Sequence, residues 1–333
     1  MLRNKQMSKI KNIGVLTSGG DSPGMNAAIR AVVRASIYYD IEVTGFIRGY
    51  EGLISNDFMP MDRKSVANII QRGGTILKTA RSEAFRTVEG RKTAYENLKA
   101  KGIDALIVIG GDGTFTGANI FSKEFDFPVV GLPGTIDNDL AGTDFTIGYD
   151  SAINTVIDAV DKIRDTAESH DRLFIVEVMG RDSGLIALRS GIGVGAEAIM
   201  IPEANMNADD ILHKLEHSRK DKASKIIIVA EGDDTGGAFK VGEILQAKYP
   251  HYDTKVSILG HIQRGGKPTC MDRVLASQLG VAAVEALIKG ENSVMIGQVN
   301  REITFTPFDH AIKHIDAEKV STKWLKLIDI LSF

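Results

Sequence analysis

The chain has 333 residues, of which 43% are apolar and 25% are charged, proportions that exclude a largely disordered protein. Its net charge of -3 provides no general basic excess, so neither nucleic acid nor a membrane surface is expected as a partner. A single cysteine, Cys270, excludes an intramolecular disulfide framework, and the first twelve residues lack the apolar core of a signal peptide, so a cytoplasmic protein is expected.

Short β-branched runs alternate with longer helical patterns along the chain. Seven runs are predicted to be buried strands: 13–17, 43–47, 105–109, 129–132, 174–178, 226–229 and 256–259. Seven helices are predicted between and after them: 24–38, 89–101, 114–124, 151–168, 207–219, 238–248 and 272–289. This alternation is typical of parallel α/β units, which bind ligands at the carboxyl ends of their strands.

The length favours two Rossmann-like α/β/α lobes with mostly parallel sheets and an active-site cleft between them. No proline-rich or Ser/Gly linker divides the chain, so it is expected to cross between the lobes more than once. The sequence contains 34 glycines, about one residue in ten, against an average near 7%. These glycines are clustered, and the clusters follow predicted strands.

The first cluster, SGGDSPG at 18–24, lies between a strand and a helix. Ser22 is predicted to cap that helix and Pro23 to occupy its first position, while the glycines allow backbone N–H groups to approach a phosphate. A tight turn without a ligand is the alternative interpretation of this cluster taken alone.

The second cluster, GGDGT at 110–114, repeats the arrangement but places an acidic residue among the glycines. A carboxylate beside a phosphate is repulsive unless a cation lies between them, so Asp112 indicates Mg²⁺. Neither cluster is a Walker A loop, because no Gly-Lys-Ser/Thr follows, and neither has the pattern of a dinucleotide-binding fold. Nucleotide binding outside both of those classes is the prediction.

An acidic segment, GLPGTIDND at 131–139, follows the next strand. If it is extended, Thr135, Asp137 and Asp139 share a face. Two carboxylates and a hydroxyl on one face suit a division between proton abstraction from a substrate hydroxyl and support of a metal. An Asx-type turn with solvated aspartates is the alternative.

At these positions the chain resembles the 6-phosphofructokinase family. The matching motifs are GVLTSGGD at 14–21 with PGMNAAIR at 23–30, GGDG at 110–113, PGTIDND at 133–139, VEVMGR at 176–181 and LGHIQRGG at 259–266. They occur in the family's order over nearly all of the chain. The resemblance implies transfer of the γ-phosphoryl group of a nucleotide to the 1-hydroxyl of fructose 6-phosphate. It also implies a homotetramer whose active sites are completed by a neighbouring subunit.

The resemblance assigns roles to individual residues. It implies that Asp137 is the general base, that Thr135 binds the transferring group, and that Arg81 and Arg181 are cations at the transferring phosphate. Mg²⁺ would be held by Asp112, with Asp139 as a second support. The implied ATP-binding residues are Gly19, Gly20, Tyr50, Arg81, Ser82, Gly111, Asp112, Gly113 and Thr114. The implied residues of the sugar-phosphate site are Thr135, Asp137, Arg172, Met179, Gly180, Arg181, Glu231, Lys255, His261 and Arg264.

The two lobes follow from the same resemblance: a nucleotide-binding lobe of residues 1–150 plus about 263–315, and a sugar-phosphate-binding lobe of about 151–262 plus 316–333. Arg172 would reach in from a neighbouring subunit, and Lys255 stands where the family commonly has a second such arginine. Lysine keeps the positive charge but lacks the bidentate fork of arginine, so weaker sugar-phosphate binding is expected.

A regulatory site is also implied. The residues that match the family's allosteric site are Arg30, Arg34, Arg63, Arg164, Glu197, Lys220 and Lys222. Four surrounding positions, Lys64, Asn68, Ala223 and Ser224, differ from the bacterial pattern, which leaves the effector's identity open. Two solvated arginines on an exposed helix face are the alternative for Arg30 and Arg34.

The phosphoryl donor is predicted from two glycines. Pyrophosphate-dependent members typically carry an aspartate where this chain has Gly113 and a lysine where it has Gly134, so ATP is the expected co-substrate. Three alternatives remain at this point: a pyrophosphate-dependent phosphofructokinase, an NAD or lipid kinase with a similar GGDG loop, and a catalytically silent sugar-phosphate-binding regulatory subunit. The last is disfavoured by the joint presence of Asp112, Asp137, Arg81 and Arg181.

Overall fold

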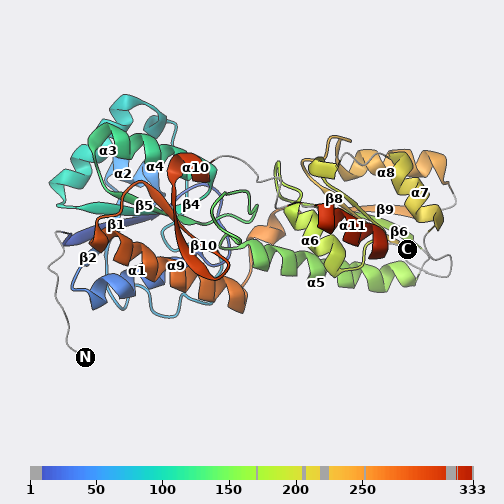
Figure 1. Ribbon diagram of the computed structural model, residues 1–333, viewed down its shortest axis with the longest axis horizontal. Coiled ribbons are helices and arrows are strands. Elements are labelled where there is room, and N and C mark those ends of the chain that lie inside the picture. Colours follow the sequence, from blue (N-terminus) through green and yellow to red (C-terminus); the bar gives the residue numbers. More distant parts are fainter. Residues whose placement is uncertain are drawn as a thin grey trace. The chain divides into compact units, whose positions relative to one another are not determined.

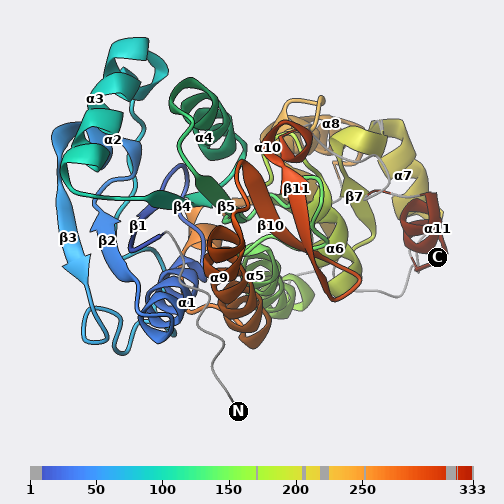
Figure 2. The ribbon, with the colours of Figure 1, turned by 60° about the vertical axis from the view of Figure 1, so that its left-hand side comes forward.

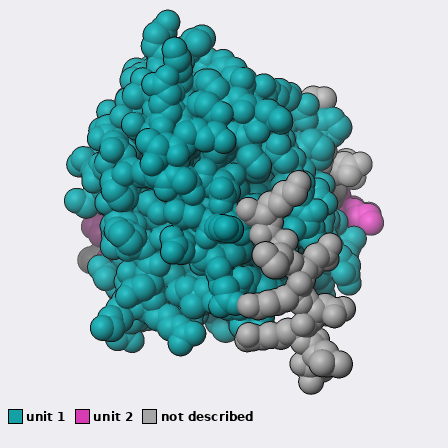
Figure 3. All heavy atoms as spheres, turned by 90° about the vertical axis from the view of Figure 1, so that its left-hand side faces the viewer, with its two compact units in different colours: residues 1–135, 140–148, 265–314 teal, residues 136–139, 149–264, 315–333 magenta. Residues whose placement is uncertain are grey.

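The computed structural model describes residues 10–169, 172–204, 208–217, 225–250, 253–312, 320 and 322–331. The chain divides into two compact units, each made of segments that are distant in sequence (Figure 1). Unit 1 comprises residues 1–135, 140–148 and 265–314 and is coloured teal in Figure 3. Unit 2 comprises residues 136–139, 149–264 and 315–333.

Unit 1 contains a seven-stranded sheet. Its strands are β1 (Asn12–Thr17), β2 (Glu42–Phe46), β3 (Phe58–Met61), β4 (Ala105–Gly110), β5 (Val129–Pro133), β10 (Val294–Val299) and β11 (Glu302–Pro307). The spatial order is β11-β10-β5-β4-β1-β2-β3, with all pairs parallel except those formed by the edge strands β3 and β11. The carboxyl ends of β1, β4 and β5 are therefore neighbours at one edge of the sheet.

Helices cover both faces of this sheet. They are α1 (Met25–Tyr38), α2 (Tyr50–Ser55), α3 (Val88–Ala100), α4 (Asp112–Phe125), α9 (Cys270–Lys289) and α10 (Phe308–Ala311), with a 3₁₀ turn η1 (Ala84–Arg86). Figures 1 and 2 show α1 and α9 together on one face and α2, α3 and α4 on the other.

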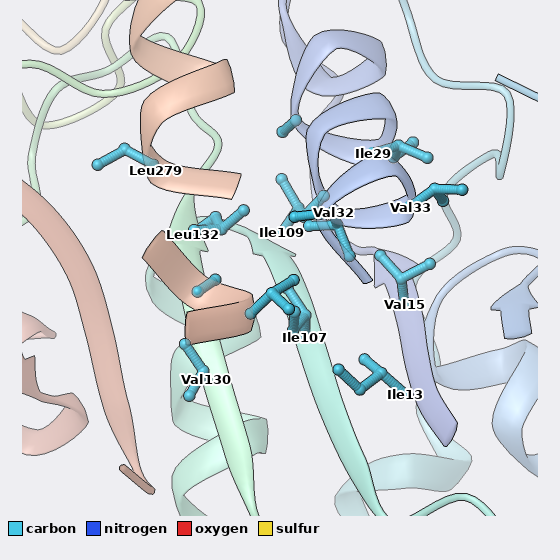
Figure 4. Close-up of a cluster of buried hydrophobic side chains, with 14 of the residues drawn as sticks. Ile13, Val15, Ile29, Val32, Val33, Ile107, Ile109, Val130, Leu132 and Leu279 are labelled. Atoms are coloured by element: carbon cyan, nitrogen blue, oxygen red, sulfur yellow. The ribbon is translucent and has the colours of Figure 1, made fainter. Parts of the chain in front are cut away.

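The two-residue period of the strands produces these two layers. On β4, Ile107 and Ile109 pack in the cluster formed with α1 and α9, whereas Leu106 and Val108 pack in the cluster on the other face. Figure 4 shows the first cluster, in which Val32 of α1 and Leu279 of α9 lie over the strands. A central sheet buried on both faces fixes the strand ends that carry the glycine clusters.

Unit 2 has a smaller, fully parallel sheet with strand order β7-β8-β6-β9. Its strands are β6 (Arg172–Val178), β7 (Ala198–Met200), β8 (Lys225–Ala230) and β9 (Asp253–Ile258). Its helices are α5 (Tyr149–Glu168), α6 (Leu185–Gly193), α7 (Ala208–His217), α8 (Gly237–Lys248) and α11 (Thr322–Leu331), with 3₁₀ turns η2 (Pro202–Ala204) and η3 (Gly260–Arg264). Apolar residues of α7 and α8 pack on one face of β6, β7 and β8. No helix in the described part of the chain is long and apolar enough to span a membrane.

The structure confirms the predicted α/β class with mostly parallel sheets. All seven predicted strands and all seven predicted helices are present, with ends shifted by three residues at most. The predicted cap of the first helix is wrong: α1 begins at Met25, its N-cap is Gly24 with a φ of 110°, and no side chain caps it. A left-handed N-cap favours glycine, so Gly24 ends the loop and Ser22 lies inside it.

Candidate active site

The two predicted phosphate loops lie side by side in unit 1. Because β1 and β4 are paired with Thr17 opposite Ile109, the chain leaves both strands at the same edge. The N–H of Ser18 donates to the carbonyl of Ile109 at 3.0 Å. A Cβ atom at Gly110 would lie 2.5 Å from the carbonyl oxygen of Ser18, so glycine is required for this close approach.

The first turn of α4 offers donors to an anion. The helix begins at Asp112, and no side chain caps its N-terminus at Gly111. Thr114 is buried, and its hydroxyl has no hydrogen-bond partner within the described part of the chain. A Cβ atom added to Gly19 of the neighbouring loop would lie 3.5 Å from that hydroxyl. Uncapped N–H groups, the positive end of the helix dipole and a buried hydroxyl together fit a phosphate oxygen.

Asp112 and Gly113 border this anion position. Asp112 is partly exposed at the first residue of α4, and a Cβ atom at Gly113 would meet nothing within 4 Å. The protein's own packing therefore does not require glycine at 113.

The described residues contain no cluster of three or more His, Cys, Asp or Glu side chains suited to a metal. A single carboxylate next to a phosphate position fits Mg²⁺, which binds through one or two carboxylates and the oxygens of a phosphate substrate.

Tyr50 supports the first turn of α4 from behind. Its hydroxyl donates to the carbonyl of Thr114 at 2.5 Å, and its ring stacks on Phe85 with 4.0 Å between the ring centroids. Burial raises the pKa of Tyr50 well above its ordinary value, so the ring stays neutral. Ser82 lies two residues before η1, the turn that contains Phe85. Its hydroxyl donates a hydrogen bond to the carboxylate of Glu51 at 2.7 Å.

Thr135 lies two residues after β5, the third of the parallel strands whose carboxyl ends meet at this edge of the sheet. Its side chain faces Gly111, whose added Cβ atom would lie 3.5 Å from the Cβ of Thr135. Its carbonyl accepts a hydrogen bond of 2.6 Å from the hydroxyl of Thr146. Gly134 is tightly packed, since a Cβ atom there would lie 2.9 Å from Ile109 and 3.2 Å from Met25. A lysine at 134 would have to displace this core contact.

Asp137 and Asp139 follow in a segment that belongs to unit 2. The prediction that 135–139 is extended is wrong, because the chain bends at 136–137 and Asn138 has a left-handed φ of 53°. The argument from a shared face therefore does not apply. Both carboxylates are nevertheless buried, each with 8% of its residue surface exposed. Burying two carboxylates is costly, which excludes the alternative of a solvated turn.

In unit 2, six of the predicted sugar-phosphate residues lie at the carboxyl edge of the sheet. Since β6 lies between β8 and β9, the segments after these three strands are neighbours. They carry Met179–Arg181 after β6, Glu231 after β8, and His261 and Arg264 in η3. The side chains of Arg181 and His261 are exposed, as a ligand site requires.

Two side chains hold the loop after β6 in place. One carboxylate oxygen of Glu231 accepts from the N–H of Arg181 at 2.8 Å and of Gly180 at 3.4 Å. The side-chain oxygen of Gln263 accepts from the N–H of Met179 at 3.2 Å, and its amide nitrogen donates to Gly260 at 3.1 Å. These bonds stabilise the left-handed φ of 56° at Arg181. Sequence reasoning missed Gln263, whose only signal is its place in the motif at 259–266.

Arg172 and Lys255 lie elsewhere in unit 2, around one carboxylate. Asp253 binds the Nε of Arg172 at 2.7 Å and the Nζ of Lys255 at 2.6 Å, and the two hydrogen bonds, that from Lys255 first, lower the pKa of Asp253. Arg172 is the first residue of β6, and Met179 follows its last residue. The strand between them spans about 20 Å at about 3.3 Å per residue. Arg172 is therefore far from the sugar-phosphate loop of its own subunit.

The predicted regulatory residues fall in both units. In unit 1, Arg34 and Arg63 are exposed and Arg30 is partly exposed. In unit 2, the guanidinium of Arg164 donates to the carbonyl of Val194. The buried carboxylate of Glu197 accepts from the N–H of Ile226 at 2.6 Å, so one of its oxygens binds the protein's own backbone. Lys220 and Lys222 lie outside the described residues.

Comparison with known proteins identifies the family. The sequence profile of the phosphofructokinase family matches residues 12–287. The chain is 57% identical over 309 residues to ATP-dependent 6-phosphofructokinase 2 of Bacteroides thetaiotaomicron, covering 92% of this chain and 95% of that protein. It is 52% identical to ATP-dependent 6-phosphofructokinase 1 of Thermus thermophilus, covering 97% of this chain and all of that protein.

A solved structure agrees with these sequence relatives. The phosphofructokinase of Saccharomyces cerevisiae superposes with a TM-score of 0.87 at 40% identity over 97% of this chain. This chain spans 48% of the length of the yeast chain. The match of both the profile and the long relatives leaves one conclusion: the chain belongs to the phosphofructokinase family.

Proposed function

We infer that this chain is an ATP-dependent 6-phosphofructokinase, a kinase of glycolysis that forms fructose 1,6-bisphosphate and ADP from fructose 6-phosphate and ATP. The observation that carries this inference is identity above 50% to curated ATP-dependent 6-phosphofructokinases over more than nine-tenths of each chain. The chain also carries GGDG at 110–113 and PGTIDND at 133–139, two of the motifs by which it resembles this family.

Asp137 is the proposed general base. Its carboxylate takes the proton from the 1-hydroxyl of fructose 6-phosphate as that oxygen forms a bond to the γ-phosphorus of ATP. The bond between the γ-phosphorus and the β–γ bridging oxygen breaks, and ADP leaves with the electron pair. General base catalysis of this kind contributes about 10²- to 10⁴-fold in rate.

Asp112 is the proposed Mg²⁺ ligand, with Asp139 as a second candidate. When bound, the ion neutralises charge on the nucleotide's phosphate oxygens. The anion position beside Gly19, Gly111 and Thr114 then receives the phosphate chain, and Arg81, Arg181 and Thr135 bind the transferring group. Phosphoryl transfer depends mainly on positioning and charge stabilisation, so these residues matter as much as the base.

The fructose 6-phosphate site is proposed at the carboxyl edge of the unit 2 sheet. Met179, Gly180, Glu231, His261 and Arg264 form it, with Glu231 also fixing the backbone that presents Arg181.

We further propose a cytoplasmic homotetramer in which Arg172 and Lys255 serve a neighbouring subunit's site. The distance from Arg172 to the loop of its own subunit, about 20 Å along the strand, supports this arrangement. Regulation at Arg30, Arg34 and Arg63 remains part of the proposal.

Lys255→Arg should lower the half-saturation concentration for fructose 6-phosphate, because arginine binds a phosphate with two parallel hydrogen bonds and lysine does not. The measurement is initial rate against fructose 6-phosphate at saturating ATP. Lys240→Arg is the matched control, since Lys240 is an exposed lysine of unit 2 paired with Glu243, and it should leave the curve unchanged. An unchanged or raised half-saturation value for Lys255→Arg would contradict this placement.

The donor is proposed to be ATP rather than pyrophosphate. The open space at Gly113 leaves room for the α-phosphate of a nucleotide, and a lysine at 134 would have to displace the side chains of Ile109 and Met25. Initial rates with each donor at equal fructose 6-phosphate test the proposal directly. Turnover with ATP at least a hundredfold above that with pyrophosphate is expected, and comparable rates would refute the donor assignment.

A further inference from the structure

Asn26 is a buried amide whose hydrogen bonds all reach a single distant loop. Only 1% of its surface is exposed. Its side-chain nitrogen donates to the carbonyls of Arg72 and Gly73, both at 3.1 Å, and its side-chain oxygen accepts from the N–H of Ile76 at 2.8 Å. These bonds cross 46 to 50 residues of sequence. They replace secondary structure in a loop that forms no helix or strand between 72 and 81.

A second side chain, Thr17, holds the far part of this loop. Its hydroxyl donates to the carbonyl of Lys78 at 2.9 Å and lies 2.9 Å from the hydroxyl of Thr75. Lys78 has a left-handed φ of 57°, which a non-glycine residue adopts only when its surroundings impose it. Thr17 is the last residue of β1, and Asn26 lies in the first turn of α1. The strand and helix that flank the first glycine loop therefore also fix the loop at 72–81.

Arg81 lies at the end of this loop, three residues after Lys78. Its side chain is exposed, and no hydrogen bond or ion pair to another described residue orients its guanidinium. The position of its backbone is thus the main constraint on where the charge can act. Gly73 restricts the loop further, because a Cβ atom there would lie 2.1 Å from the carbonyl oxygen of Gly266.

We propose that Asn26 is a positioning residue for phosphoryl transfer, which acts by fixing the loop that carries Arg81 relative to the first glycine loop. The proposal rests on the proposed function, in which Arg81 stabilises the transferring phosphate. Asn26 is buried and its side-chain amide bonds only to this loop, so the proposed effect on the reaction is indirect. A displacement of about 1 Å in such a group can reduce the rate by about 10²-fold.

The test is a double-mutant cycle with Asn26→Ala and Arg81→Ala. Asn26→Ala should lower kcat by about 10- to 100-fold, with KM for ATP and for fructose 6-phosphate changed by less than about threefold. If Asn26 acts through Arg81, the double variant should be within about twofold of Arg81→Ala alone. A double variant whose loss equals the product of the two single losses would overturn the proposal, as would an Asn26→Ala variant with kcat within twofold of the unsubstituted enzyme.

Asn97→Ala is the control for loss of a side-chain amide that donates to two backbone carbonyls, although Asn97 is half-buried whereas Asn26 is buried. The side chain of Asn97 donates to the carbonyls of Leu53 and Ile54 at 2.8 and 3.0 Å, in another part of unit 1. It should lower the melting temperature as Asn26→Ala does, without the loss of kcat. If Asn26→Ala does not fold, Thr17→Val removes the second anchor with its shape retained, and the same cycle with Arg81→Ala applies.

The outcomes separate this proposal from the function on which it rests. An unsubstituted enzyme with no turnover of ATP and fructose 6-phosphate would refute the function. Normal turnover together with a fully active Arg81→Ala variant would leave the function intact and overturn the role of Asn26, because no residue would remain for it to act through.

Discussion

Asp137→Ser should reduce kcat by about 10²- to 10⁴-fold while fructose 6-phosphate still binds. The substitution removes the carboxylate that takes the proton of the 1-hydroxyl but leaves the sugar-phosphate residues of unit 2 in place. The measurement combines steady-state rates with the dissociation constant of fructose 6-phosphate, determined by calorimetry. Loss of rate with a dissociation constant within a few-fold of that of the unsubstituted enzyme is the expected pattern.

Two variants control for the burial of Asp137. Asp137→Asn keeps the shape and should lose a similar factor in rate, because an amide cannot accept the proton. Asp233→Ser removes an equally buried aspartate of unit 2, 8% exposed, whose carboxylate accepts from the N–H of Thr235 at 3.0 Å. It should cost stability without a comparable loss of rate. Near-normal turnover by Asp137→Ser or Asp137→Asn would show that another group is the base.

Asp112→Ala should abolish Mg²⁺-dependent turnover. Stabilisation by a bound ion amounts to several kcal/mol, which corresponds to a rate loss of about 10³-fold or more. The measurement is initial rate over a range of Mg²⁺ concentrations at fixed ATP and fructose 6-phosphate. The variant is expected to show no saturable increase in rate as Mg²⁺ is raised.

Asp112 also stabilises α4 as an acidic residue in its first turn, so a helix-end control is needed. Glu89 occupies the first turn of α3 and is exposed. Asp112→Ala and Glu89→Ala should each cost about 0.3 to 1 kcal/mol of stability, but only the former should lose activity. A Mg²⁺ response in Asp112→Ala equal to that of the Glu89→Ala variant would contradict the assignment of the metal ligand.

All the predicted strands and helices are present, but α6, α11 and several strands were not predicted from the sequence. β7 has three residues and β3 has four with a proline, too few for a two-residue period to be recognised. The hairpin of β10 and β11 turns through Asn300 and Arg301, both with left-handed φ values. Such turns usually have glycine at the second position, and this glycine is what identifies a hairpin in a sequence. Because Arg301 stands there, the hairpin could not be recognised.

The site was predictable to the extent that it depends on parallel strands. Glycine clusters that follow neighbouring strands must meet at one edge, which is where 18–24 and 110–114 lie. The roles of Gln263 and Asn26 were not predictable, because each depends on contacts with segments 84 and 46 to 50 residues away. The bend after Thr135 was considered only as the alternative of an Asx-type turn, although Asn138, whose φ is left-handed, is of a residue type that tolerates this conformation.

The central claim is that this chain transfers phosphoryl groups from ATP to fructose 6-phosphate. The most direct measurement follows ADP release and fructose 1,6-bisphosphate formation together in the same reaction, with and without fructose 6-phosphate. Equal amounts of both products, formed only when ATP, Mg²⁺ and fructose 6-phosphate are all present, are predicted. Binding of fructose 6-phosphate without formation of either product would contradict the account.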